Sequence, residues 1–440
     1  TLAFIHSFIH SYFLLLLLLH MISGPSFSSS SSSSCNALIR HYARSGNVKK
    51  ALLLFDQFLC EEPFFPDKFT FVNILSVCCK EKLIKKGKCI HAIAVIMNLE
   101  SDIMLATSIV NMYGKCGHLE DAQKTFKDLD IKDVISWNAM ISTYAKYGYE
   151  TQCFKLFHEM HQNCLLADKF TFVSMLSACG NVDNLRHGRY MHVILSHVCH
   201  EEEVIIGTAL LDMYSKCCSI EDAEKVFDLM NHRDITSWNA MISGYSNSCR
   251  KQDAFYLFYE MMLKGIVPNM VTFVCLVDVC TISKSLLEAR EIHSHLIEEG
   301  FEMDVVLGSS LVNMYCKCYS LNDAHRTFDI LPERNLISWN SMIAGCVANQ
   351  HEEEAFKIFG AMRSEGIINP DSVTYTTLIE ACAKIENFCE GEQIFNLALQ
   401  NDLGIDSSVA ASAIKLYGKC DKVEKSFTVF EKISRKSSEV

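Results

Sequence analysis

The three tryptophans of this 440-residue chain are spaced 101 residues apart, at Trp137, Trp238 and Trp339. Each lies in a phrase that reads Ser-Trp-Asn-Ala/Ser-Met-Ile, and a weaker copy begins at Ser34 with Cys35 in place of tryptophan. A fixed period over four copies is typical of a tandem array, in which each unit packs mainly on its neighbours. The sequence therefore predicts a solenoid and argues against the single core of a globular enzyme.

The 101-residue period is itself divided into shorter units. A Met/Leu-Tyr-x-Lys-Cys phrase recurs with its tyrosine at Tyr113, Tyr214, Tyr315 and Tyr417. A third phrase, Phe/Val-Thr-Phe/Tyr, recurs with its last aromatic residue at Phe71, Phe172, Phe273 and Tyr375. Each period therefore contains three sub-repeats of about 35, 35 and 31 residues.

The spacing of apolar residues inside a sub-repeat predicts two helices. Trp137, Met140 and Tyr144 follow one another at steps of three and four, and the pattern breaks near Gly148 before it resumes at Cys153. Only six prolines and a hydrophobic content of 49% suit a chain that is mostly helical. We therefore expect an all-α fold of tandem antiparallel helix pairs.

The 21 cysteines do not predict a disulfide scaffold, because eight of them occupy two fixed places in the period, in the series that begin at Cys78 and Cys116. A small apolar side chain at a recurring helix contact accounts for them, in a reducing compartment. His91, His192 and His293 also recur, but Phe395 takes the matching place in the last unit, so we interpret this as a packing position. No metal or cofactor is predicted.

Residues 1–31 differ from the rest of the chain. They contain an unbroken leucine run, Leu14 to Leu19, and neither Lys nor Arg occurs before Arg40. The segment matches neither a secretory signal nor a transit peptide, and its leucine run is shorter than the ~20 apolar residues that span a bilayer. We expect a non-repeat leader that is disordered or wrongly assigned, and no membrane association.

These phrases and the 35-35-31 alternation resemble the pentatricopeptide repeat proteins of plants, and within them the PLS subclass. The resemblance covers four P-L-S triplets, at residues 32–133, 134–234, 235–335 and 336–437, followed by a tail at 438–440. It implies a right-handed α-solenoid, or superhelix, of helix pairs. Tetratricopeptide repeats fit less well, because their 34-residue period does not alternate.

The resemblance also implies that the chain binds single-stranded RNA, with one base per repeat read by two side chains. We call the residue after the first-turn aromatic position the first reader, and the residue that closes the repeat the second reader. In the P-type units the pairs are Asn36 with Asp67, Asn138 with Asp168, Asn239 with Asn269, and Asn340 with Asp371. In the short units they are Thr107 with Asp133, Thr208 with Asp234, and Ser309 with Asn335. The alternative interpretation is that these residues only cap helices.

By the same resemblance, Asn with Asp implies U, Asn with Asn implies C or U, Thr with Asp implies G, and Ser with Asn implies A. The predicted core is 5′-U-N-G-U-N-G-Y-N-A-U. The L-type units stay open, because most of them carry valine at the first-reader position: Val72, Val173 and Val274, with Thr376 as the exception. A net charge of −12 predicts modest affinity and weak salt dependence, because RNA binding usually relies on cationic phosphate contacts.

Members of the PLS subclass commonly specify C-to-U editing sites, and many carry a deaminase domain with a Cys-x-x-Cys zinc signature. No two cysteines here are three positions apart. We therefore expect no enzyme activity in this chain, with a deaminase or other editing-complex proteins acting in trans, in a mitochondrion in preference to a chloroplast. The alternatives are an RNA processing or stabilisation factor, a helical-repeat scaffold for proteins, and a truncated gene product.

Overall fold

The computed structural model describes residues 29–61, 66–198, 203–301, 305–401, 403–404 and 406–437. All regular structure in these ranges is α-helical, which confirms the predicted fold class. The first helix begins at Ser29, three residues before the predicted start of the first triplet. The remainder of the predicted leader, residues 1–28, and the tail 438–440 lie outside the described residues.

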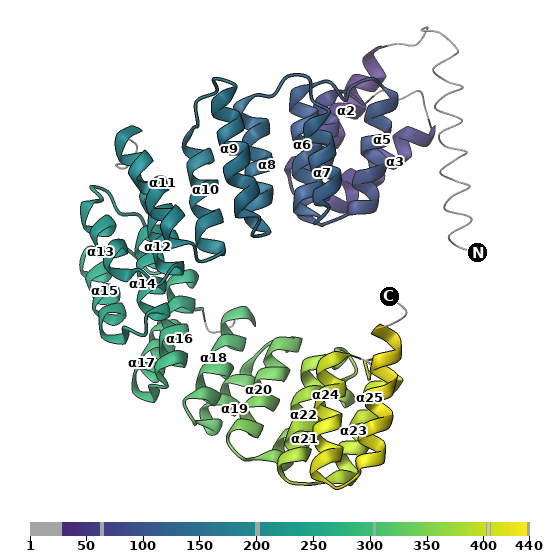
Figure 1. The fold of residues 1–440 in the computed structure, drawn as a ribbon, viewed down its shortest axis with the longest axis vertical. Helices are drawn as coiled ribbons and strands as arrows, with labels where there is room; N and C mark the ends of the chain where they lie inside the picture. Colours follow the sequence, from purple (N-terminus) through teal and green to yellow (C-terminus); the bar gives the residue numbers. More distant parts are fainter. Residues whose placement is uncertain are drawn as a thin grey trace. The chain divides into compact units, whose positions relative to one another are not determined.

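The chain forms two compact units, which we describe separately. The helices of the first unit pair in order along the chain (Figure 1). They are α2 (Ser29–Arg44), α3 (Val48–Glu61), α4 (Lys68–Lys80), α5 (Ile84–Ile96), α6 (Ile103–Lys115), α7 (Leu119–Lys127), α8 (Val134–Lys146), α9 (Glu150–Gln162), α10 (Lys169–Asn181) and α11 (Leu185–Val198).

The second unit continues the same arrangement. Its helices are α12 (Val204–Lys216), α13 (Ile220–Leu229), α14 (Ile235–Asn247), α15 (Lys251–Leu263), α16 (Met270–Ser283), α17 (Leu286–Glu298), α18 (Val305–Lys317), α19 (Leu321–Ile330), α20 (Leu336–Ala348), α21 (Glu352–Glu365), α22 (Ser372–Lys384), α23 (Phe388–Gln400), α24 (Ser407–Lys419) and α25 (Val423–Ser437).

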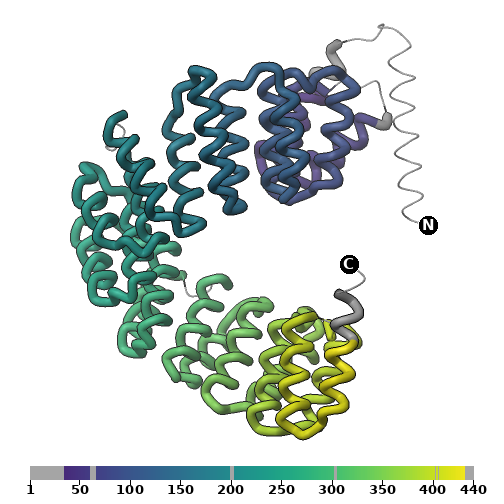
Figure 2. Tube along the Cα trace, viewed as in Figure 1, coloured from purple at the N-terminus to yellow at the C-terminus, as the bar shows by residue number. Residues whose placement is uncertain are grey.

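Each even-numbered helix is the first of a pair, and it joins the odd-numbered helix by a short turn (Figure 2). The predicted break at Gly148 is such a turn, with a φ of +73°. Most of these turns need one left-handed residue, which glycine adopts without strain. Cys218 and Tyr319 replace the glycine of the equivalent turn at Gly117 and hold φ values of 51° and 60°. The backbone conformation of the turn is therefore the same even where a residue other than glycine makes it less favourable.

Within each unit the even-numbered helices form one continuous layer, because each packs on the next even-numbered helix. Each odd-numbered helix packs on its own partner, and most also contact the next even-numbered helix. The tryptophans fill the spaces between these layers, since Trp137, Trp238 and Trp339 are 3%, 1% and 2% exposed. Each meets a phenylalanine of the preceding odd-numbered helix edge to face, at ring distances of 4.9–5.1 Å.

The recurring cysteines and histidines pack inside this framework. Cys78, Cys179, Cys280 and Cys382 are fully buried, and they are free thiols, as are the other cysteines whose side chains the structure describes. His91 and His293 hydrogen-bond through Nδ1 to the hydroxyls of Tyr113 and Tyr315, at 2.9 and 2.8 Å. Phe395 packs on Tyr417 in the last unit. The packing interpretation of both series is therefore confirmed for these members.

Candidate RNA-binding face

Within the described ranges, nine even-numbered helices begin after a residue whose side chain caps them, and the predicted second readers are seven of these caps. Asp168 accepts a hydrogen bond at Oδ1 from the backbone N–H of Thr171, at 2.9 Å, and Asn335 accepts one from Ser338 in the same way, at 2.8 Å. The same cap is formed by Asp67, Asp133, Asp234, Asn269 and Asp371. A short polar side chain is required at this place because the first N–H groups of a helix have no partner within it.

The structure brings the two readers of each P-type pair together, because the first reader lies on one even-numbered helix and the second caps the next. The amide of Asn138 donates to Oδ1 of Asp168 at 2.8 Å, and the amide of Asn340 donates to Oδ1 of Asp371 at 3.0 Å. The corresponding distance for Asn239 and Asn269 is 3.2 Å. In the first pair, Asn36 instead accepts from the backbone N–H of Asp67 at 3.5 Å.

The hydrogen bonds of the reader pairs in the short units are less uniform. The Ser309 hydroxyl donates to Oδ1 of Asn335 at 3.2 Å. The Thr208 hydroxyl lies 3.4 Å from that of Ser237 instead of contacting Asp234. The Thr107 hydroxyl is buried and makes no hydrogen bond among the described residues. The sequence therefore predicts which residues are neighbours, but the bonds between them differ from unit to unit.

The first and second readers also differ in how far their side chains are buried. Four first readers are almost covered, since Asn36, Thr107, Asn239 and Ser309 are 2–6% exposed. The second readers are half-buried or, at Asp234, exposed. In each pair, therefore, mainly the second reader is accessible to a ligand, and the first reader lies beneath it.

In most second readers, one of the two polar atoms at the end of the side chain makes no hydrogen bond to the described residues. Every hydrogen bond that Asp133, Asp168, Asp234 or Asp371 accepts from the described residues goes to Oδ1. Asn269 and Asn335 likewise use Oδ1 alone. What remains is a carboxylate oxygen, which only accepts, or an amide nitrogen, which only donates. Asp67 departs from this pattern because its Oδ2 is paired with Arg40 at 2.5 Å.

The carboxylates of Asp168 and Asp371 are charged at neutral pH. Burial tends to raise the pKa of Asp168, but hydrogen bonds from the Thr171 N–H and the Asn138 amide outweigh it, so the pKa lies below its usual value. The balance is the same for Asp371, with Thr374 and Asn340 as the donors. Both side chains therefore present a hydrogen-bond acceptor under physiological conditions.

A set of exposed apolar side chains accompanies the readers and was not predicted from the sequence. They occupy the second residue of nine even-numbered helices and are 46–66% exposed: Phe69, Met104, Ile135, Phe170, Ile205, Val271, Val306, Ile337 and Val373. We call them the apolar ladder. The first reader is the fifth residue of the same helix, so the two side chains share one face. On α10, for example, Val173 at the first-reader position is half-buried, whereas Phe170 is 57% exposed.

The comparisons with known proteins agree with this architecture. A profile of the PPR repeat family matches residues 132–181, 233–281 and 334–384, and a PPR repeat profile matches 33–61, 106–134, 208–235 and 373–403. Together they cover more than half of the chain. The fold and the repeated cap-and-reader arrangement are those of a helical repeat protein, and the chain belongs to the pentatricopeptide repeat family.

The chain is similar to plant proteins of this family in sequence and to a solved structure in fold. A chloroplastic pentatricopeptide repeat-containing protein of Arabidopsis thaliana is 32% identical over 401 residues, which are 91% of this chain and 65% of the relative. A mitochondrial one from the same plant is 31% identical over 92% of this chain and 39% of its own length. The chain thus spans less than two thirds of these relatives. The structure of PPR10 in complex with an 18-nt psaJ RNA element aligns with a TM-score of 0.56 at 18% identity, over 85% of this chain and 61% of that one, and supports the fold.

Proposed function

We propose that this chain binds single-stranded RNA in a sequence-specific manner, with one base per repeat. The observation that carries the proposal is the side-chain atom that six of the second readers, all except Asp67, leave without a hydrogen bond to the described residues; this atom recurs in register on the face that also carries the apolar ladder. The RNA in the aligned PPR10 complex supports the choice of ligand. We further infer that the repeats follow the P-L-S order.

The unused atoms suggest how bases are distinguished. A free carboxylate oxygen accepts from the ring N–H of U or G, whereas a free amide nitrogen donates to the unprotonated ring nitrogen of C or A. Asp168 and Asp371 therefore favour U or G, and Asn335 favours A or C. The first reader distinguishes purines from pyrimidines by size. A short Thr or Ser side chain leaves room for a purine, whereas the larger Asn side chain favours a pyrimidine. These rules agree with the core 5′-U-N-G-U-N-G-Y-N-A-U.

The apolar ladder supplies the non-specific part of the binding. Exposed apolar residues are ordinary when they are isolated, but nine at one position in register require a common cause. An unstacked base has an apolar face, and stacking on an aromatic side chain such as Phe69 or Phe170 contributes ~1–3 kcal/mol per base. The ladder therefore holds each base beside its reader pair, which compensates in part for the net charge of −12.

The proposal is tested by binding of the purified chain to the predicted core. A core with A at the third position is expected to bind about 5- to 150-fold more weakly, since one wrong contact costs ~1–3 kcal/mol. Phe170→Ala is expected to weaken binding of both RNAs by a similar factor. Tyr256→Ala, which removes an aromatic side chain that is 71% exposed on odd-numbered α15, should leave the binding of both RNAs unchanged. Equal affinity for the two RNAs would remove the assignment of Thr107 and Asp133.

The biological role that we propose is recognition of a C-to-U editing site in an organelle, with the deaminase supplied in trans. The chloroplastic and mitochondrial relatives support the organelle. In the described part of the chain no helix is long and apolar enough to cross a membrane. Organelle RNA from a plant lacking the gene is expected to lose a C-to-U event just downstream of the core. Altered transcript ends with editing intact would instead assign the chain to RNA processing or protection.

A further inference from the structure

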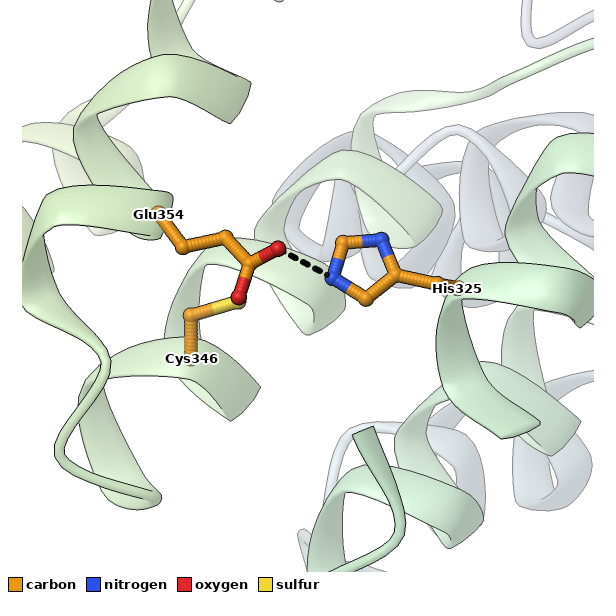
Figure 3. Close-up of side chains that lie close together, drawn as sticks. All are labelled: His325, Cys346 and Glu354. Carbon is orange, nitrogen blue, oxygen red and sulfur yellow. Dashed lines mark ion pairs between the residues drawn. The ribbon is translucent and has the colours of Figure 1, made fainter. Parts of the chain in front are cut away.

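Three side chains with metal-binding atoms converge in the last third of the chain. His325 lies on α19, Cys346 on α20 and Glu354 on α21, and their ligand atoms all lie within 4.8 Å of one another. His325 Nε2 is 2.9 Å from a carboxylate oxygen of Glu354. Figure 3 shows the Glu354 carboxylate between the imidazole and the thiol. It is the one group of this kind among the residues that the structure describes.

The repeat shows that this group is not part of the common framework. The residues 101 positions earlier are Glu224, Tyr245 and Asp253. There the Tyr245 hydroxyl donates to Glu224 at 3.0 Å, and Arg250 pairs with Glu224 and Asp253 at 2.8 and 2.7 Å, so every charge has a partner. At the positions 101 residues later, the tyrosine is replaced by cysteine and the glutamate by histidine. The closed network of hydrogen bonds is therefore replaced by three atoms that can bind a metal: one sulfur, one nitrogen and one oxygen.

The surroundings of the three donors suit a metal better than a simple ion pair. Cys346 is fully buried, and its sulfur lies within 4.8 Å of the ligand atoms of His325 and Glu354. His325 Nε2 is shielded from solvent and makes no well-directed hydrogen bond, in spite of its short distance to Glu354. A buried nitrogen without a directed bond is costly unless another partner satisfies it.

We propose that His325, Cys346 and Glu354 bind one zinc ion, with the fourth position taken by water. Zinc takes Cys sulfur, His nitrogen and carboxylate oxygen in tetrahedral sites. Ligands at about 2.0–2.3 Å from the ion lie roughly 3.4–3.7 Å from one another, which needs only small movements from the present spacing. Binding displaces the thiol proton of Cys346, because the thiolate is the ligand. The ion would join α19, α20 and α21 and stabilise the last triplet.

Zinc titration of the whole chain, freed of metal with a chelator, tests the proposal. We expect one equivalent of tight binding, measured by competition with a chromophoric chelator, and a Tm that rises with zinc. Cobalt in place of zinc should give a sulfur-to-metal charge-transfer band near 300–350 nm, on the order expected for a Co–thiolate bond. Cys346→Ala and His325→Ala should each lose that equivalent and the band.

Two further variants separate metal binding from folding and from the other cysteines. The double variant H325E/C346Y, made together with His351→Arg, restores the glutamate, tyrosine and arginine found 101 positions earlier, so it is expected to fold and to lose the equivalent. His187→Ala is the matched control, because His187 pairs with Glu150 at the same distance of 2.9 Å without a cysteine in reach, and it should keep the equivalent. If zinc stoichiometry and the cobalt band were the same in this folded combined variant, another set of cysteines would be the site and the proposal would be wrong.

Discussion

Replacing Asp133 with asparagine is expected to change the preferred base at the third position of the RNA core from G to A. The substitution exchanges the unused carboxylate oxygen for an amide nitrogen, so an acceptor becomes a donor. G presents a ring N–H at this edge and A presents an unprotonated nitrogen. We expect the ratio of affinities for the G and A cores to reverse, with a change of ~1–3 kcal/mol in each direction. Binding to the two RNAs, measured by fluorescence anisotropy at one salt concentration, checks this.

The helix cap should survive this substitution, which makes the experiment interpretable. Asp133 caps α8 through Oδ1, at 2.8 Å from the Ser136 N–H, and Asn335 caps α20 through its own Oδ1 at the same distance. Asp and Asn are similarly effective at this position. The reciprocal variant, Asn335→Asp, should therefore keep the fold and change the ninth base from A to G. A loss of affinity for all RNAs, without any exchange of preference, would indicate that these side chains are only caps.

The helix pairs and their caps could be predicted from the sequence because both depend on local chemistry. Trp137, Met140 and Tyr144 mark one helix face by their spacing, and Gly148 marks the turn. The polar residue after a proline, as at Pro370 and Asp371, marks the next helix start, and the structure places a cap there. These signals need no knowledge of distant residues.

The depth of the readers could not be predicted in the same way. A period gives the order of residues along the chain, whereas exposure depends on how closely adjacent helices pack. Thr107 and Ser309 are therefore almost covered although they occupy the first-reader position. The apolar ladder could not be predicted from the sequence, because its members differ in residue type. Phe170, Met104 and Ile135 have in common only their position in the helix and an exposed side chain.

The His325, Cys346 and Glu354 group was missed for a different reason. Its members lie on three helices, and their spacing matches no metal signature. Comparison of the periods could have found it, because Cys346 stands where Tyr144 and Tyr245 stand in the two preceding triplets. A departure from a repeat at a packed position needs a local explanation, and here three departures meet at one place.

Trp238→Ala is expected to lower the free energy of unfolding by ~3–5 kcal/mol, the usual range for truncating a buried aromatic residue. Trp238 is 1% exposed and packs on Phe227 at 5.1 Å, and Lys264 lies 5.1 Å from its ring. Urea unfolding followed by far-UV circular dichroism measures the change. Because a solenoid unfolds as a series of neighbouring units, the loss should appear first as an early transition of the second unit.

Trp238→Phe separates the loss of volume from the loss of the indole N–H. That N–H is buried and makes no hydrogen bond among the described residues, so phenylalanine removes no bond and keeps most of the edge-to-face contact with Phe227. We expect it to destabilise the unit by clearly less than alanine does. Cys35 already occupies the equivalent position in the first triplet, so the repeat tolerates a smaller residue there. Equal losses for the alanine and phenylalanine variants would mean that the indole N–H has a partner, and that the tryptophans are kept for that bond and not for their volume.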